Sequence, residues 1–424
     1  MDAWPRGPAR TKSWEGSIVT TTLRPPSSSP AGKPRTVVSV KRLFRAESGE
    51  YVVMVATVLF LVAFGLVMVL SSSFVGSALG NDGNFFATFV RQALWALLGI
   101  PLMLTVSRLK PIQIKRATPA VFLAALVFQA LVFTAFGITE GGNRAWVNIA
   151  GFSGQPSEIL KVALIAWMAA ILSDRLDYLH DYRVLMKPLA VGVGVALALV
   201  VAGRDLGTVG IMTMIALGVA FLAGIRLSHL AALMGVLGAF LAIFAVISPS
   251  RVSRIMTWFS GCTEDDYLTT CWQSVHSTFA LGSGGLLGVG LGNSRAKWSW
   301  LPAAETDFIF AIVGEELGLA GTTLVMVAFV VLAVAMARMV RAQQDPFARI
   351  VTGGVMVWLI GQALVNIAVV LEFLPVLGVP LPFMSMGGSA LLSSLIAIGL
   401  VMALNRTGSE SVTEYRARRR ATAR

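Results

Sequence analysis

The chain has 424 residues, of which 56% are hydrophobic and only 13% are charged. Soluble domains carry about a quarter charged residues, so the composition excludes an ordinary soluble protein and predicts many membrane-spanning segments. The net charge of +12 would suit a nucleic-acid partner only if the basic residues gathered on one exposed surface.

Residues 1–45 are rich in Ser, Pro, Thr, Arg and Lys and contain few large apolar side chains. Such a segment cannot bury a core, so we expect it to be disordered. We expect a membrane domain over 46–405 and a second basic cytoplasmic tail over 406–424, which suits anionic membrane lipid.

Apolar runs of the length that crosses about 30 Å of hydrocarbon follow the first tail. They lie at 51–71, 85–105, 117–137, 156–173, 188–203, 207–223, 228–248, 307–337, 348–371 and 386–404. The predicted fold is therefore an all-α polytopic membrane protein with about ten transmembrane helices. The fifth and sixth runs are either two short helices or one broken re-entrant unit. The eighth is overlong, so its helix is expected to extend into the cytosol.

The basic residues predict the orientation of these helices. With the N-terminus inside, 26 of the 34 Lys and Arg residues lie on the cytoplasmic side, as membrane proteins prefer. Both termini are then cytoplasmic, and one long exoplasmic loop, about 249–306, joins spans seven and eight. The positive charge is explained by topology, so we expect no nucleic-acid partner.

The only two cysteines, Cys262 and Cys271, lie in the polar segment GCTEDDYLTTCW of this loop. Two thiols are too few for a metal site, so a disulfide is favoured over two free thiols.

Charged residues also occur at the start of the fourth span, in QPSEILK. Pro156 suits the first turn of a helix, and Glu158 and Lys161 are three residues apart and share a face. They form either a local ion pair that lets the helix end enter the bilayer or the charged wall of an outward-facing cavity.

Two further polar segments flank predicted spans. Asp205, in GRDLGT, either breaks the helix or contacts substrate. The segment PLPFMSMGGSALL opens the last span with small polar residues, which either present a helix N-terminus to an anion or allow close helix packing. Its candidate residues are Ser385, Gly387, Gly388 and Ser389.

A glycine-rich stretch at 281–292 is followed by Arg295 and Lys297. These two side chains suit an anionic group, with lipid-headgroup contact as the alternative.

The segment LPAAETDFIFAIVGEELG, at 301–318, carries four acids where a span begins. Acids at membrane depth usually serve a function. Asp307 lies at the outer start of the helix, whereas Glu315 is about 12 Å deeper. At 100° per residue, Glu315 and Glu316 are offset from Asp307 by about 80° and 180°. The three acids therefore cannot share one face, and Glu315 and Glu316 are expected to find partners on other helices.

Several of these motifs occur together in the order and spacing of one family. QPSEILK, DLGT, GLGNSRAKWSWLP…TDFIFAIVGEELG and LPFMSMGGSALL resemble the SEDS family (shape, elongation, division and sporulation), the RodA/FtsW glycosyltransferases of bacterial cell-wall synthesis. The resemblance covers about 50–405. GLVMVLSSS and NIAVV…LPVLGVPLPF look more like the division-type FtsW branch.

The resemblance implies a peptidoglycan polymerase in the bacterial cytoplasmic membrane, at the division septum. It implies lipid II as substrate, a class B penicillin-binding protein and other division membrane proteins as partners, and a divalent cation, Mg²⁺ or Mn²⁺, as cofactor. Asp307 matches the family's essential carboxylate, and Glu158 and Lys161 match residues that line a central cavity. We expect Asp307 to act as general base, and Lys297 and Lys161, with Arg144 and Arg295, to neutralise the donor pyrophosphate.

The chain departs from the family pattern beside these motifs. Ala303 and Glu305 replace a common Glu and His, Arg204 replaces a Pro, and Met386 replaces a Tyr. Glu372 stands where a Gly is common. Two other functions also fit the pattern: a lipid II flippase, and a non-catalytic scaffold that activates a partner synthase.

Overall fold

Long apolar helices make up most of the computed structural model, which describes residues 48–80, 83–140, 142–149, 151–176, 182–246, 249–269, 271–298 and 300–406. The described residues all belong to one compact unit. The predicted basic tails lie outside the described residues, apart from Arg406.

Among the described residues, eight helices are long and apolar enough to cross a membrane. They are α1 (Gly49–Gly80), α2 (Ala87–Val106), α3 (Pro111–Ala130), α4 (Pro156–Asp174), α7 (Leu227–Val246), α11 (Ile309–Ala342), α12 (Pro346–Val370) and α13 (Gly388–Asn405). Two helices with shorter apolar parts, α5 (Tyr182–Ala202) and α6 (Leu206–Leu222), complete the bundle. The predicted polytopic helical membrane fold is confirmed, and each predicted apolar run corresponds to one of these helices.

The helices differ in how much of their surface the protein itself covers. α4, α12 and α13 are mostly buried, whereas α2, α3 and α7 present exposed apolar side chains. A helix that is apolar all round needs either protein or lipid on every side. The first group therefore forms the centre of the bundle, and the second presents a surface suited to lipid.

Helix starts follow the sequence signals. Pro111, Pro156 and Pro346 each open a helix, where a missing N–H costs nothing. The α12 N-cap Asp345 accepts a hydrogen bond from the Phe347 N–H at 2.9 Å.

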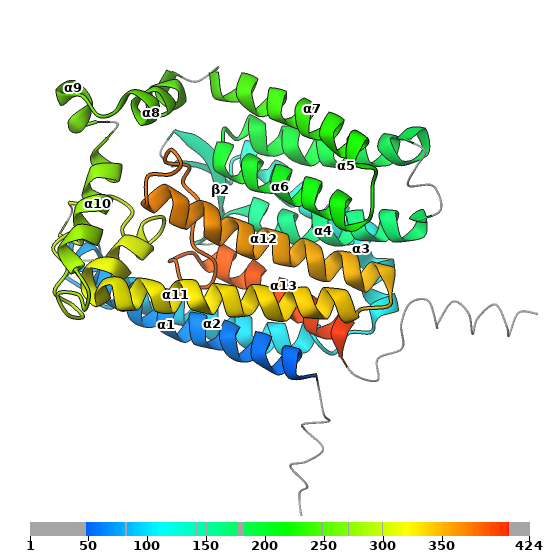
Figure 1. The fold of residues 1–424 in the computed structure, drawn as a ribbon, viewed down its shortest axis with the longest axis horizontal. Helices are drawn as coiled ribbons and strands as arrows, with labels where there is room; N and C mark the ends of the chain where they lie inside the picture. The colour runs from blue at the N-terminus through cyan, green and yellow to red at the C-terminus, as the bar shows by residue number, and fades with distance from the viewer. Residues whose placement is uncertain are drawn as a thin grey trace, which may run out of the picture. The chain divides into compact units, whose positions relative to one another are not determined.

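Three short helices lie at one end of the bundle, which we call the loop end (Figure 1). They are α8 (Pro249–Ser260), α9 (Glu264–Tyr267) and α10 (Trp272–Gly284). The predicted long loop at 249–306 is therefore largely helical in its first two thirds. Cys262 and Cys271, which flank α9, are joined by a disulfide.

A small antiparallel sheet also lies between α3 and α4, in the order β1-β2-β3. Its strands are β1 (Gly137–Glu140), β2 (Asn143–Ile149) and β3 (Phe152–Gly154). The expectation of helices alone missed this sheet, and the third span ends earlier than residue 137. The available signal was the EGGN turn between two runs of mixed polarity, which is typical of a hairpin.

The overlong α11 is not one regular helix. Gly318 has φ +65 and breaks it one turn after its first acids. The segment after α10 pairs with this break, because the Val289 and Gly290 N–H groups donate to the Glu315 and Glu316 carbonyls at 2.9 and 3.0 Å. Part of the extra length is therefore a kinked first segment, 309–317, that packs beside the loop, which the expectation of a cytosolic extension did not include.

Candidate functional site

Asp307 lies in the loop that leads into α11, at the loop end. Its backbone carbonyl accepts a hydrogen bond from the Asn366 amide of α12 at 2.7 Å. The same amide donates to the Val379 carbonyl at 2.8 Å. Asn366 therefore ties the segment that carries Asp307 to the chain after α12, and both are fixed against the centre of the bundle.

The Asp307 carboxylate is partly exposed, and no described residue donates a hydrogen bond to it. Burial, with the nearby negative charges of Asp205 and Glu305, raises its pKa to about 6, against the opposing effect of Arg254. A carboxylate with this pKa is ionised near neutral pH yet is a stronger base than an ordinary aspartate. The geometry thus presents Asp307 as the candidate proton acceptor.

Asp205 caps α6 beside this acid. Its carboxylate accepts hydrogen bonds from the Thr208 N–H at 2.9 Å and the Gln155 amide at 2.7 Å. This cap shows that α6 begins as a helix of its own after α5. Both carboxylate oxygens of Asp205 accept hydrogen bonds from the protein, and one of these bonds caps the start of α6.

Glu158 and Lys161 form an ion pair of 2.9 Å, and each is only 2% exposed. The Lys161 ammonium also donates to the Gln362 side-chain oxygen Oε1 at 2.9 Å and lies 4.9 Å from the centre of the Trp358 ring. The structure therefore supports the alternative of a local ion pair. It places the pair inside the bundle rather than on the wall of an open cavity.

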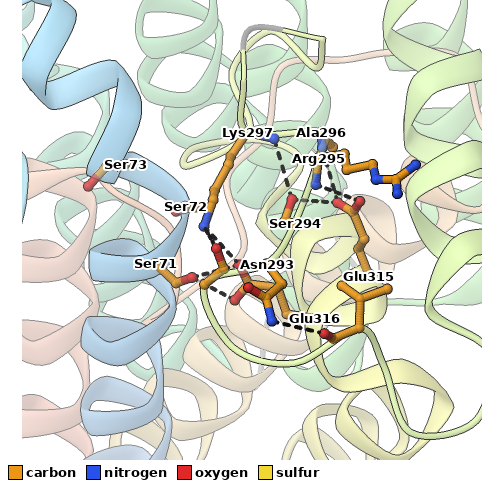
Figure 2. Close-up of polar contacts among 12 residues, drawn as sticks. Ser71, Ser72, Ser73, Asn293, Ser294, Arg295, Ala296, Lys297, Glu315 and Glu316 are labelled. Atoms are coloured by element: carbon orange, nitrogen blue, oxygen red, sulfur yellow. Dashed lines mark hydrogen bonds and ion pairs between the residues drawn. The ribbon is translucent and has the colours of Figure 1, made fainter.

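Lys297 is also buried in an ion pair, with Glu316 of α11 at 3.5 Å. Its ammonium donates in addition to the Gly292 carbonyl. The Ser71 hydroxyl of α1 donates to both Glu316 oxygens at 2.6 Å. Figure 2 shows the Lys297 side chain directed toward this group. The charge expected to hold the donor pyrophosphate is thus already neutralised within the protein.

The Glu315 side chain binds the same loop, mainly at backbone N–H groups of the loop. Its carboxylate accepts from the Arg295 N–H at 2.8 Å, from the Ala296 N–H at 3.2 Å and from the Ser294 hydroxyl (Figure 2). The three acids of the motif do have separate surroundings. The expectation that both glutamates pair with other helices was wrong for Glu315, because its partners are loop residues.

The other two candidate cations, Arg144 and Arg295, make no described contact with Asp307. The Arg144 side chain donates to the Thr134 carbonyl at 2.9 Å and so fastens the small sheet to the end of α3. The Arg295 side chain is exposed.

The start of α13 is closely packed. A Cβ at Gly388 would lie 2.2 Å from Trp95 Nε1 of α2, which supports the close-packing alternative. The Ser389 hydroxyl accepts from the Gln155 N–H at 3.1 Å, and the Gly387 N–H donates to Gln92 at 3.1 Å. Ser385 accepts from the Leu381 N–H at 2.7 Å. These residues hold the loops of the loop end in place.

Sequence reasoning missed α8 and Asn366 as parts of this site. Asn366 was visible as a lone amide within the apolar run ALVNIAVV, and Arg251 and Arg254 are three residues apart in PSRVSRIMTWF. Such spacing indicates one helix face, but not what that face packs against.

Comparisons with known proteins agree on one family. The FtsW, RodA and SpoVE family model, described as "Cell cycle protein", matches residues 51–410. A protein of Mycobacterium tuberculosis, named "Probable peptidoglycan glycosyltransferase FtsW", is 36% identical over 86% of this chain and 69% of its own length. "Stage V sporulation protein E" of Bacillus subtilis is 34% identical over 83% of this chain and 96% of its own.

Solved structures show the same fold at lower identity. A chain from "Structural coordination of polymerization and crosslinking by a peptidoglycan synthase complex" superposes with a TM-score of 0.68 and 22% identity, covering 85% of this chain and 98% of that one. The rod shape determining protein RodA of Thermus thermophilus superposes with a TM-score of 0.63 and 24% identity, covering 86% and 98%.

Proposed function

This chain belongs to the FtsW, RodA and SpoVE family, and we propose that it is a peptidoglycan glycosyltransferase that polymerises lipid II on the outer face of the cytoplasmic membrane. The names of its FtsW relatives support the activity and a role in cell division. The observation that places the reaction at Asp307 concerns its carboxylate. This group accepts no hydrogen bond from the described residues, and its pKa is raised.

The proposed reaction uses Asp307 as general base. Its carboxylate takes the proton from the 4-hydroxyl of the acceptor sugar, and the resulting oxygen nucleophile attacks the anomeric carbon of the donor. The bond from that carbon to the diphosphate oxygen breaks, and undecaprenyl diphosphate leaves with the electron pair. The anomeric centre is inverted. Proton transfer of this kind contributes roughly 10²- to 10⁴-fold to a rate.

A divalent cation, Mg²⁺ or Mn²⁺, fits the acid site only if it is shared with the substrate. Among the described residues, no three His, Cys, Asp or Glu side chains form a metal-holding group. Asp307, with Glu305 nearby, could contribute carboxylate oxygens, and Mg²⁺ commonly binds one or two carboxylates together with substrate phosphates. Such an ion would neutralise charge on the leaving diphosphate.

We also assign the protein to a complex with a class B penicillin-binding protein and other division proteins at the septum. The support is the structural relationship to a chain of a solved synthase complex that couples polymerization and crosslinking and the FtsW names of its relatives.

Reconstitution with lipid II tests the function. The purified protein, with a partner synthase whose transpeptidase is blocked, should make glycan polymer on a gel. Asp307→Asn should reduce the rate by at least roughly 100-fold while the protein is made and folded normally. Polymer formation by Asp307→Asn would refute the base assignment. Movement of labelled lipid across vesicles without any polymer would instead indicate a flippase, and activation of the partner alone would indicate a scaffold.

A further inference from the structure

The cation that faces Asp307 is not one of the two lysines that the motifs suggested. Lys297 and Lys161 are both buried and both paired with glutamates, at 3.5 and 2.9 Å. A diphosphate brings several negative charges close to Asp307, and an uncompensated arrangement of this kind is costly. The site therefore needs a positive group that is accessible and not already neutralised.

Two side chains of helix α8 donate hydrogen bonds to backbone carbonyls at the loop end. The Arg251 guanidinium donates to the Arg204 carbonyl, directly before the α6 cap Asp205. The Trp258 indole donates to the Glu372 carbonyl, just beyond the end of α12, at 2.8 Å. Arg204 and Glu372 have φ of +64 and +61, uncommon for residues other than glycine. Two unusual backbone turns thus present their carbonyls to one short helix.

Arg254 lies on the same face of α8 as these two contacts. At 100° per residue, Arg251, Arg254 and Trp258 fall within about 60° of one another. Arg251 and Trp258 contact the α6 and α12 sides of the site, and Arg254 lies between them along the helix. Asp307 is joined to the same two sides, because Asn366 of α12 donates to its backbone carbonyl and the charge of Asp205, the α6 cap, raises its pKa.

The Arg254 side chain is available for an anion. It is exposed, and no salt bridge to it is recorded among the described residues. Its positive charge lowers the pKa of Asp307, against the larger effect of burial. A guanidinium also matches phosphate oxygens with two parallel N–H donors, which a lysine cannot do.

We propose that Arg254, oriented by the α8 contacts at Arg251 and Trp258, binds the diphosphate of the lipid-linked donor on the side opposite Asp307. This assignment rests on the proposed glycosyltransferase function and deepens it. Arg254 is a substrate-binding residue, whereas Arg251 and Trp258 are positioning residues.

The first test measures polymerisation rate against lipid II concentration for wild type, Arg254→Gln and Arg254→Lys. Loss of a charge-assisted bidentate contact should raise KM roughly tenfold or more for Arg254→Gln, while kcat falls by less than about threefold. Arg254→Lys should fall between the two. Arg226→Gln, which removes an exposed arginine far from α8 in the chain, is the matched control and should behave as wild type.

The second test measures binding of inorganic pyrophosphate to the purified protein by calorimetry in the absence of divalent cations. Arg254→Gln should weaken binding by the same factor as it raises KM, whereas Asp307→Asn should strengthen it by removing a repulsive charge. Trp258→Phe replaces the indole with a smaller aromatic ring that has no N–H, so it should shift KM in the same direction as Arg254→Gln with a smaller magnitude.

The outcomes separate the two proposals. If wild type makes no polymer, the glycosyltransferase function fails, while pyrophosphate binding still reports on Arg254. If wild type polymerises lipid II but Arg254→Gln changes neither KM nor pyrophosphate affinity, the inference about Arg254 alone is overturned. A loss of kcat at unchanged KM would equally overturn it, because it would place Arg254 in the chemical step instead of donor binding.

Discussion

The Lys297 ammonium lies 3.5 Å from the Glu316 carboxylate, and the two side chains are 5% and 0% exposed. Lys297 comes from the loop between α10 and α11 and Glu316 from the first segment of α11, and Ser71 of α1 donates to the same carboxylate. The loop before Asp307 is therefore joined to α11 by an ion pair, and the same carboxylate joins α11 to α1 by hydrogen bonds. If Lys297 serves this ion pair, its replacement should lower the stability of the folded protein, whereas replacement of a substrate-binding lysine should weaken substrate binding.

Removing one partner of this pair should destabilise the protein. Lys297→Met leaves Glu316 buried without its counter-ion, and Glu316→Gln leaves Lys297 in the same condition, at a cost of roughly 3 kcal/mol each. The double variant should recover a large part of that loss, since neither charge is then left buried. Thermal unfolding in detergent, followed by tryptophan fluorescence, measures the effect.

Arg295→Met is the control for this series, because Arg295 is exposed and two residues from Lys297. It should change the unfolding temperature little. Single variants at Lys297 and Glu316 as stable as wild type would show that the pair does not fasten the loop.

Gly288 should tolerate no side chain. It has φ +81, and a Cβ there would lie 2.1 Å from the Glu316 carbonyl oxygen. Gly288→Ala combines backbone strain with a clash against backbone, so we expect a loss of more than about 2 kcal/mol. Gly282→Ala is the matched control, because a Cβ at Gly282 meets nothing within 4 Å and its φ is ordinary. Equal unfolding temperatures for the two variants would contradict the close approach.

The membrane helices could be predicted from the sequence because a bilayer demands long apolar runs with internally bonded backbones. The start of α4 at Pro156 followed from local signals as well. The small sheet at 137–154 was missed because its strands are short and only weakly patterned.

The pairing of charges could not be predicted in the same way. Nothing local indicates that Lys297 meets Glu316, because the contact depends on the backbone reversals at Gly288 and Gly318. The position of Arg254 likewise depends on contacts from α8 to distant turns. Sequence motifs predicted Asp307 as the catalytic carboxylate, with Lys297 and Lys161 as the cations of the site, and the fold buries both lysines in ion pairs.

The turn before Asp205 should reject proline. Arg204 has φ +64, whereas proline is fixed near −65°. Arg204→Pro would introduce the residue common in the family, yet it should lower stability by about 3 kcal/mol and release the contact from Arg251. Arg204→Gly should be at least as stable as wild type, since glycine adopts positive φ freely. Normal unfolding of Arg204→Pro would show that the turn adopts the other conformation.

The raised pKa of Asp307 predicts opposite effects of pH on activity and on stability. Since its pKa is raised to about 6, polymerisation should increase as pH rises from 5 to 7 and the base becomes ionised. The control for titration of other ionisable groups is the residual rate of Asp307→Asn over the same pH range. That rate should not increase between pH 5 and 7. An unchanged increase in that variant would assign it to another group.

The stability of the folded protein should change with pH in the opposite direction to the activity. A carboxyl whose pKa rises from 3.8 to about 6 on folding binds its proton more tightly in the folded state. Its stabilising contribution is complete below pH 4 and is lost as pH rises through 6. At pH 7.5 Asp307→Asn should therefore be more stable than wild type, by about 1 kcal/mol after allowance for partial exposure, and the difference should vanish below pH 4. Thermal unfolding at pH 4 and 7.5 measures it, and a variant less stable than wild type at pH 7.5 would show that the ionised carboxylate is favourably held.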